Sequence, residues 1–209
     1  MQKVVNIIKH NMKWMILFIC ILIFLSLTED VFEQEIMQGD IIGYQWIANH
    51  LINNHITPIM KMITWFGSAT CLIIITVLLW ILIKNKRIGL LATINLITIT
   101  VLNQVLKFII QRPTEYRIIE ESGYSFPSGH SMVSMAFYGL LIYFIYKHIK
   151  NKYIKWALIC ILSILILSIG ISRIYLGVHY VSDVCAGFVV SIAYLIVFLG
   201  MTNKLKIKI

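Results

Sequence analysis

The fold of this chain is decided by residues 154–183, which read IKWALICILSILILSIGISRIYLGVHYVSD. Residues 154–172 carry a single charge, Lys155, and an apolar run of this length can cross a bilayer as one helix. Polar residues gather immediately after it, among them Arg173, His179 and Asp183. A membrane span that ends in such a cluster predicts a helical membrane protein with its chemistry at the end of a span.

The composition of the whole chain agrees with a membrane protein. Of its 209 residues, 59% are hydrophobic and 13% are charged, whereas soluble domains average about 25% charged residues. We expect an all-α fold, a bundle of six transmembrane helices that forms a single domain over residues 1–209. Six apolar runs have suitable lengths, at about residues 13–29, 64–83, 88–107, 131–147, 154–172 and 182–201.

Basic residues are distributed unevenly among the segments that join these runs. They precede the first run, separate the second from the third and the fourth from the fifth, and follow the sixth. The positive-inside rule makes these segments cytoplasmic. We therefore expect a multi-pass protein of the plasma membrane with both termini in the cytoplasm and with segments 108–130 and 173–181 outside. This topology accounts for the net charge of +9, so we expect no nucleic-acid partner.

The segment before the second run also shows a pattern. In residues 32–53, apolar residues recur at roughly helical spacing, with an interruption at Gly39-Asp40. One or two amphipathic helices on the outer membrane interface are typical of this pattern, and a solvated loop is the alternative. We expect the next helix to start near Thr57-Pro58 and to bend at Gly67-Ser68.

The cysteines lie within or close to the apolar runs. They form no CxxC pair and no cluster with histidine at zinc-binding spacing. We expect buried, inert thiols and no disulfide at Cys20, Cys71, Cys160 and Cys185.

The cluster after residue 172 has the residue types of phosphoryl transfer through a phosphohistidine. His179 is a candidate nucleophile if one ring nitrogen is unprotonated. Asp183 follows one helical turn later, where a carboxylate can accept a hydrogen bond from the other ring nitrogen and fix the tautomer. A helix-surface pair is the alternative, but an acid that enters a membrane span is costly and usually functional.

A second group precedes the fourth run, at Pro127-Ser128-Gly129-His130. His130 is a candidate general acid, since its pKa can lie near the working pH. Gly129 lets the backbone approach a phosphate closely, N–H groups at a helix start bind anions, and Ser128 adds a hydroxyl donor. For this tetrapeptide alone, an ordinary turn from loop to helix is the alternative.

Three cations complete the set. Lys107, Arg112 and Arg173 can place positive charge on phosphate oxygens. A lysine at the end of a span commonly extends to the interface without any function. Basic residues are scarce on the expected outer side, however, where the others are Lys61 and Arg117.

These residues resemble the three signature motifs of the type-2 phosphatidic acid phosphatase superfamily, whose members include lipid phosphate, undecaprenyl-diphosphate and phosphatidylglycerophosphate phosphatases. The motifs are Lys107 with Arg112-Pro113, then residues 127–130, then residues 172–183, and the resemblance covers about residues 60–200. It implies a reaction without a metal or other cofactor, in which His179 is the nucleophile, Asp183 its orienter and His130 the general acid. The residues that it implies for phosphate binding are Lys107, Arg112, Ser128, Gly129 and Arg173.

The first motif is shorter than the family pattern. Four residues separate Lys107 from Arg112-Pro113, where the family usually has six, and Thr114 stands at the position of the usual arginine. Either Arg112 reaches the phosphate from a shorter loop or Arg117 substitutes for it. We favour Arg112.

We therefore expect a membrane phosphatase that hydrolyses a lipid phosphate or diphosphate at the outer membrane face. Undecaprenyl diphosphate fits that side best, and phosphatidylglycerophosphate and phosphatidic acid are close alternatives. A lipid phosphotransferase would share the first half of the reaction. A transporter of lipids or polyanions is the non-enzyme alternative, but transporters place ionisable residues at mid-span, and here they lie at span ends. The oligomeric state is left open.

Overall fold

The structure is a computed structural model of the chain, and it describes residues 2–33, 37–113, 119 and 123–204. Within these residues the secondary structure consists of eight α-helices without strands, which confirms the all-α prediction. The helices are α1 (Gln2–Phe32), α2 (Gln38–His50), α3 (Ile56–Trp65), α4 (Ala69–Leu82), α5 (Lys86–Ile110), α6 (Gly129–His148), α7 (Lys152–Tyr175) and α8 (Val181–Lys204).

Five helices, α1, α5, α6, α7 and α8, are long and apolar enough to cross a membrane. Helices α3 and α4 meet the same criteria only as a pair, and they are bent by 49° relative to each other. With that pair the described residues hold up to six spans. The second expected span, 64–83, is therefore a broken one, in agreement with the bend expected at Gly67-Ser68.

Local chemistry explains this break. The Ser68 side chain accepts a hydrogen bond from the Cys71 N–H, at 3.3 Å, and so caps the start of α4. A Cβ atom on Gly67 would lie 2.7 Å from Cγ2 of Ile169, so only glycine lets the bend pack against α7. The bend therefore lies beside α7 and close to His130, whose Cδ2 would be 3.2 Å from the same Cβ.

Two helices extend further toward the site than the sequence predicted. Helix α5 continues past Lys107 to Ile110, and α7 continues past Arg173 to Tyr175. The two cations therefore lie in the last turns of helices, whereas the sequence analysis placed them at or beyond the ends of spans. Gln111 ends α5 in the left-handed region, with φ 54°, and its N–H bonds to the Lys107 carbonyl.

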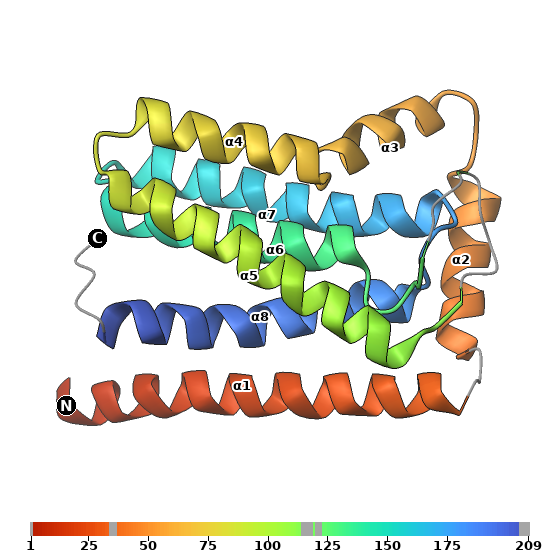
Figure 1. Cartoon of the computed structure of the whole chain (residues 1–209), viewed down its shortest axis with the longest axis horizontal. Coiled ribbons are helices and arrows are strands. Elements are labelled where there is room, and N and C mark those ends of the chain that lie inside the picture. The colour runs from red at the N-terminus through yellow and green to blue at the C-terminus, as the bar shows by residue number, and fades with distance from the viewer. Residues whose placement is uncertain (1, 34–36, 114–118, 120–122, 205–209) are drawn as a thin grey trace.

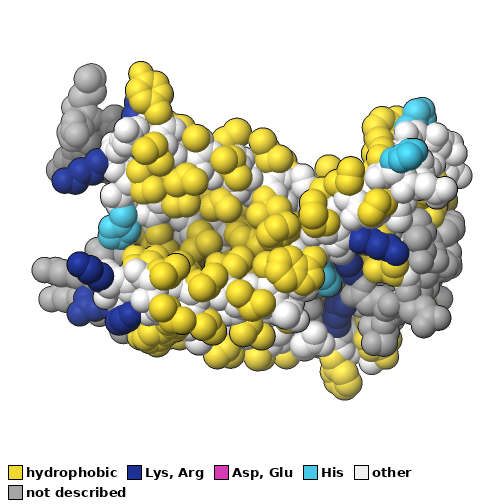
Figure 2. All heavy atoms as spheres, turned by 90° about the horizontal axis from the view of Figure 1, so that it is seen from above, with side chains coloured by type: hydrophobic (Ala, Val, Ile, Leu, Met, Phe, Trp, Pro, Cys, Tyr) yellow, Lys and Arg dark blue, Asp and Glu magenta, His cyan; other side chains and the backbone are white. Residues whose placement is uncertain are grey.

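The two ends of the bundle differ (Figure 1). The start of α1, the end of α8 and the α4–α5 and α6–α7 turns lie at one end, and α2 crosses the other end. The segments that the charge pattern assigned to one side of the membrane thus share one end of the bundle. Figure 2 shows apolar side chains over the middle of one face, with Lys and Arg side chains beyond them toward the ends.

Helix α2 departs from its expected form. It begins at Gln38 and includes Gly39 and Asp40 in its first turn, so the predicted interruption at these two residues is wrong. An acid is favoured in the first turn of a helix, which explains why the helix continues through Asp40. Helix α2 packs against α7 and α8 and buries Asp40 and Ile47, while Trp46 is exposed. Residues 34–36 lie outside the described residues.

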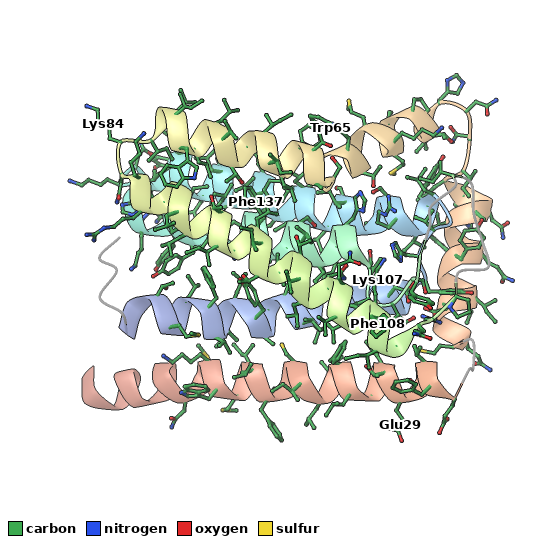
Figure 3. All side chains as sticks on the ribbon, viewed as in Figure 1. Glu29, Trp65, Lys84, Lys107, Phe108 and Phe137 are labelled. Atoms are coloured by element: carbon green, nitrogen blue, oxygen red, sulfur yellow. The ribbon has the colours of Figure 1, made fainter. Side chains whose placement is uncertain are left out.

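The core between α4, α5, α6 and α7 is apolar and aromatic. Figure 3 shows Phe137 inside the bundle, where it packs in a cluster with Leu72, Ala92 and Ile169. This core fixes α6 and α7, the two helices whose ends carry His130 and Arg173.

The cysteines only partly follow the prediction. Cys20 and Cys71 are buried, but Cys160 and Cys185 are exposed on helix surfaces, so the prediction of burial is wrong for these two. All four are described by the structure, and none of them forms a disulfide.

Candidate active site

The His179–Asp183 pair lies at the end of the bundle that α2 covers. His179 is in the short loop between α7 and α8, 6% exposed, and its Nδ1 lies 3.3 Å from Oδ2 of Asp183 in the first turn of α8. The same Oδ2 accepts a hydrogen bond from the Tyr180 N–H, at 2.9 Å. Because a carboxylate accepts at Nδ1, this nitrogen holds the proton and Nε2 keeps its lone pair.

The surroundings of His179 favour its neutral form. Burial lowers the pKa of His179, and the positive charges of Arg173 and Lys107 lower it further. The hydrogen bond and the charge of Asp183 act in the opposite direction, but the pKa stays below the ordinary value for histidine. His179 is therefore unprotonated at neutral pH, as a nitrogen nucleophile must be.

Arg173 is held by α3, the helix that precedes the bend between α3 and α4. It is 2% exposed, and its Nη1 donates to Oγ1 of Thr64 in α3, at 2.9 Å. Two residues further along α7, the Tyr175 hydroxyl lies 2.8 Å from Oγ1 of Thr57, also in α3. Helix α3 thus fixes the last turn of α7, a role that the sequence analysis did not assign to it.

Hydrogen bonds join the loop before α6 to α8 and to α5. The Ser128 N–H donates to the Asp183 carbonyl, at 3.0 Å, and the Asn103 amide donates to the Pro127 carbonyl, at 3.2 Å. A Cβ atom on Gly129 would lie 3.0 Å from Oδ1 of Asn103, so glycine permits the close approach of α5. The second and third motifs, far apart in sequence, are thereby joined through their backbones.

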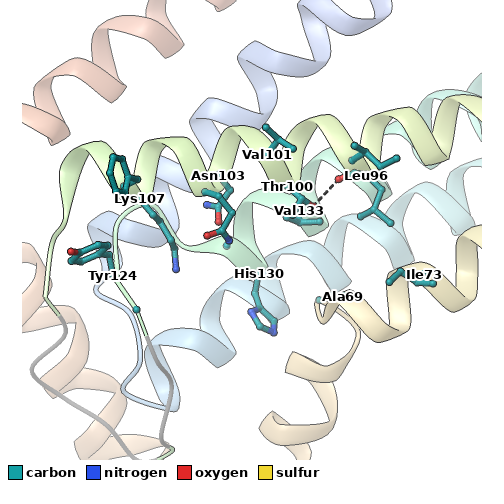
Figure 4. A pocket seen from close by; sticks show the side chains of 16 residues that line it. Ala69, Ile73, Leu96, Thr100, Val101, Asn103, Lys107, Tyr124, His130 and Val133 are labelled. Atoms are coloured by element: carbon teal, nitrogen blue, oxygen red, sulfur yellow. Dashed lines mark hydrogen bonds between the residues drawn. The ribbon is translucent and has the colours of Figure 1, made fainter.

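A cavity of about 710 Å³ lies between α4, α5 and α6 (Figure 4). At one end the side chains of Lys107 and His130 face the same space, with Gly129 and Asn103 beside them. The rest of its wall is mainly apolar, and Ile73, Ile97 and Val101 in it are exposed on the flank of the bundle. His179 and Arg173 are not among the residues that line it.

Arg112 does not lie in this cavity. It is 7% exposed, and its Nη1 lies 2.7 Å from Oδ1 of Asp183 and 2.6 Å from Oγ of Ser182. Its Nη2 lies 2.8 Å from Oδ2 of Asp40, a residue of α2. Arg112 was expected from the sequence to bind phosphate, whereas its guanidinium lies between two carboxylates.

Arg117, the alternative for the first motif, lies outside the described residues. Neither Asp40 nor Ser182 was expected from the sequence to take part in the site. The sequence gives only a weak indication of their role: Asp40 is an acid within an apolar helical segment, and Ser182 directly precedes Asp183. Among the described residues, no group of three His, Cys, Asp or Glu side chains is placed to hold a metal ion.

The sequence profile of the PAP2 superfamily matches residues 87–207, which include all three motifs. The chain belongs to the PAP2 superfamily. One relative, phosphatidylglycerophosphatase B of Bacillus subtilis (strain 168), is 34% identical over 160 residues, which cover 72% of this chain and 77% of the relative. Undecaprenyl-diphosphatase of Sulfolobus acidocaldarius is 26% identical over 201 residues, which cover 89% and 93% of the two chains.

A solved structure is similar to this PAP2 protein over most of its length. The crystal structure of the transmembrane PAP2 type phosphatidylglycerolphosphate phosphatase from Bacillus subtilis superimposes with a TM-score of 0.77. The two chains are 28% identical, and the match covers 91% of this chain and 97% of the other. The chain is thus a membrane PAP2 lipid phosphatase, and the resemblance read from the three motifs is confirmed.

Proposed function

We propose that this PAP2 protein removes the terminal phosphate of a membrane lipid through a phosphohistidine at His179. The Nε2 lone pair attacks phosphorus, and the bond from phosphorus to the leaving oxygen breaks. His130 donates a proton to that oxygen, while Asp183 accepts the Nδ1 hydrogen bond and stabilises the charged ring. In the second step His130 takes a proton from water, whose oxygen attacks phosphorus and displaces Nε2.

Positive side chains supply the charge that the transferring phosphate needs. Lys107 and Arg173 both lie near enough to His179 to lower its pKa, so a phosphate beside Nε2 would lie in the same positive field. Lys107 also faces the cavity together with His130, which is consistent with a substrate that enters from there. Ser128 and Gly129, at the start of α6, complete the proposed phosphate site.

The cavity is the observation that supports a lipid substrate. Its polar end holds Lys107 and His130, and its apolar wall reaches side chains that are exposed on the flank of the bundle, such as Ile97. A lipid has the same division, with a charged head and an apolar tail. A small water-soluble phosphate ester would leave the apolar wall without a partner.

Phosphatidylglycerophosphate is the substrate that the comparisons favour. The relative with 34% identity and the crystal structure with a TM-score of 0.77 are both named for that activity. Undecaprenyl diphosphate, which the sequence analysis favoured, is the second candidate, since a relative named for it matches 89% of this chain. We further propose that the site end of the bundle is extracytoplasmic, because the basic turns lie at the opposite end.

A substrate panel with purified protein in detergent micelles tests this function. We expect release of inorganic phosphate from phosphatidylglycerophosphate, undecaprenyl diphosphate or phosphatidic acid, with kcat/KM far above that for glycerol phosphate. Equal kcat/KM for glycerol phosphate would rule out a lipid-selective site. Transfer of the phosphate to an added alcohol, without release to water, would support the phosphotransferase alternative.

A further inference from the structure

We infer that Asp40 and Arg112 are positioning residues, through which α2 holds Asp183 and His179 in place, and that Arg112 is not a phosphate ligand. This inference rests on the proposed roles of His179 and Asp183. It gives α2, a helix that carries none of the motif residues, a defined part in the reaction.

Both terminal nitrogens of the Arg112 guanidinium already donate hydrogen bonds to protein groups. Nη1 donates both to Oδ1 of Asp183 and to Oγ of Ser182, and Nη2 donates to Oδ2 of Asp40. One face of the group lies over the Tyr180 ring, with Cζ 4.1 Å from the ring centroid. All of these partners are buried or lie in the loop of His179, so binding a phosphate would require Arg112 to leave two buried carboxylates without a cation.

Asp40 also accepts hydrogen bonds directly from Ser182, the residue before Asp183. Its Oδ1 accepts from the Ser182 N–H, at 2.7 Å, and its Oδ2 accepts from the Ser182 hydroxyl, at 2.6 Å. Ser182 is in the first turn of α8, where free N–H groups attract negative charge. Asp40 thus caps α8 from a different helix, one residue before Asp183.

The packing of α2 makes this contact possible. A Cβ atom on Gly43 would lie 2.5 Å from Cγ2 of Val181, so glycine at this position lets α2 approach the start of α8. Asp40, Gly43 and Ile47 have the spacing of one helical face, and Asp40 and Ile47 are both buried. The outer face carries Ile42 and Trp46, both exposed.

Charge balance yields a specific test. Asp40 and Asp183 carry two negative charges on either side of one cation, and Arg173 and Lys107 add positive charge near His179. If Arg112 only compensates the two carboxylates, Arg112→Gln leaves both of them buried without a cation. Asp40→Asn in the same chain then removes the excess negative charge and restores part of the lost activity.

We expect Arg112→Gln to lower kcat by roughly 10- to 100-fold with little change in KM, as residues that hold a reacting group in place typically do. The double variant Asp40→Asn/Arg112→Gln should have a kcat about 10-fold above that of Arg112→Gln. A double variant as slow as Arg112→Gln, or slower, together with a raised KM for both, would show that Arg112 binds phosphate. Glu29→Gln, which removes an exposed acid that points away from the bundle in Figure 3, is the matched control.

A second measurement needs no substrate and separates this inference from the proposed function. The ring signals of His179, identified by their loss in His179→Asn, are followed with pH by NMR of the ¹⁵N-histidine-labelled protein. Asp40→Asn should shift the His179 titration to lower pH, because it leaves Arg112 with less compensation. An unchanged titration of His179 in Asp40→Asn would overturn the inference that Asp40 and Arg112 hold Asp183 and His179 in place. A wild-type protein that releases no phosphate would overturn the proposed function alone.

Discussion

At the scale of single residues, the proposed reaction depends on one nitrogen atom. Nε2 of His179 is available because Nδ1 lies against Asp183 and because burial and two cations keep the ring neutral. Nothing else in the proposed reaction can replace the bond that this atom forms with phosphorus.

His179→Ala should therefore lower kcat by several orders of magnitude while the protein remains folded. The measurement is phosphate release, together with trapping of ³²P on the protein in the first turnover. His55→Ala, an exposed histidine in the turn that precedes α3, is the control and should keep wild-type activity. Label that persists on His179→Ala would exclude His179 as the nucleophile.

The charge environment of His179 predicts a pH effect. As the proposed nucleophile, His179 acts unprotonated, so activity should fall as the pH drops through its pKa, and the lowered pKa should extend activity to lower pH. Lys107→Met removes a charge that lowers this pKa, so the acidic limb of kcat/KM should move to higher pH. A limb that stays in place in Lys107→Met would show that Lys107 does not act on His179.

Some of the contacts around His179 can be predicted from the sequence, and others cannot. The His179–Asp183 pair was predictable because its partners are one helical turn apart. The Arg112–Asp40 pair was not, because its partners are 72 positions apart and neither has a distinctive local pattern. A carboxylate that caps another helix is visible only once the two helices are packed together.

At the scale of elements, the contact between α6 and α8 sets the relation of the second motif to the third. A Cβ atom on Gly187 would lie 2.9 Å from the Ser128 carbonyl oxygen and 3.1 Å from the Met132 nitrogen. Both are backbone atoms, so they cannot move aside as a flexible side chain would. The absence of a side chain at Gly187 thus keeps the start of α6, with His130, close to α8.

Gly187→Ala should lower both kcat and the melting temperature, because α6 and α8 must separate to admit the methyl group. Gly200→Ala is a matched control in the same helix, since a Cβ atom there would meet nothing within 4 Å. Alanine is the better helix former by about 1 kcal/mol, so the control should be neutral or stabilising. The same melting temperature and kcat for the two variants would contradict this packing.

The helices themselves were largely predictable, because long apolar runs determine them. The break at residues 66–68 was expected from Gly67-Ser68, but its angle depends on packing against Ile169 of α7. The continuation of α2 through Gly39 and Asp40 was missed because its buried face is a carboxylate, a glycine and an isoleucine. Such a face has little hydrophobic pattern to detect.

At the scale of the whole molecule, the two ends of the bundle differ. The site end holds His179 and is crossed by α2, and the basic end carries the α4–α5 and α6–α7 turns. Figure 3 shows Lys107 toward one end and Lys84 at the other. From the positive-inside rule we propose that the end with Lys84 lies in the cytoplasm. The orientation decides which leaflet supplies the substrate.

Cysteine labelling in intact cells tests this orientation. In a chain without its native cysteines, Asn54→Cys at the site end should react with a membrane-impermeant maleimide. Lys84→Cys should react only after the cells are permeabilised. The reverse pattern would place the site in the cytoplasm and make the inner leaflet the source of the substrate.

The cavity that opens on the flank of the bundle has a kinetic consequence. A substrate that reaches Lys107 and His130 from that side diffuses in the plane of the bilayer and does not leave it. The relevant concentration is then the number of lipid molecules per unit of membrane area, not per volume of water. Dilution with inert lipid would slow the enzyme at constant total substrate, and the two products would separate, phosphate into water and the shortened lipid into the membrane.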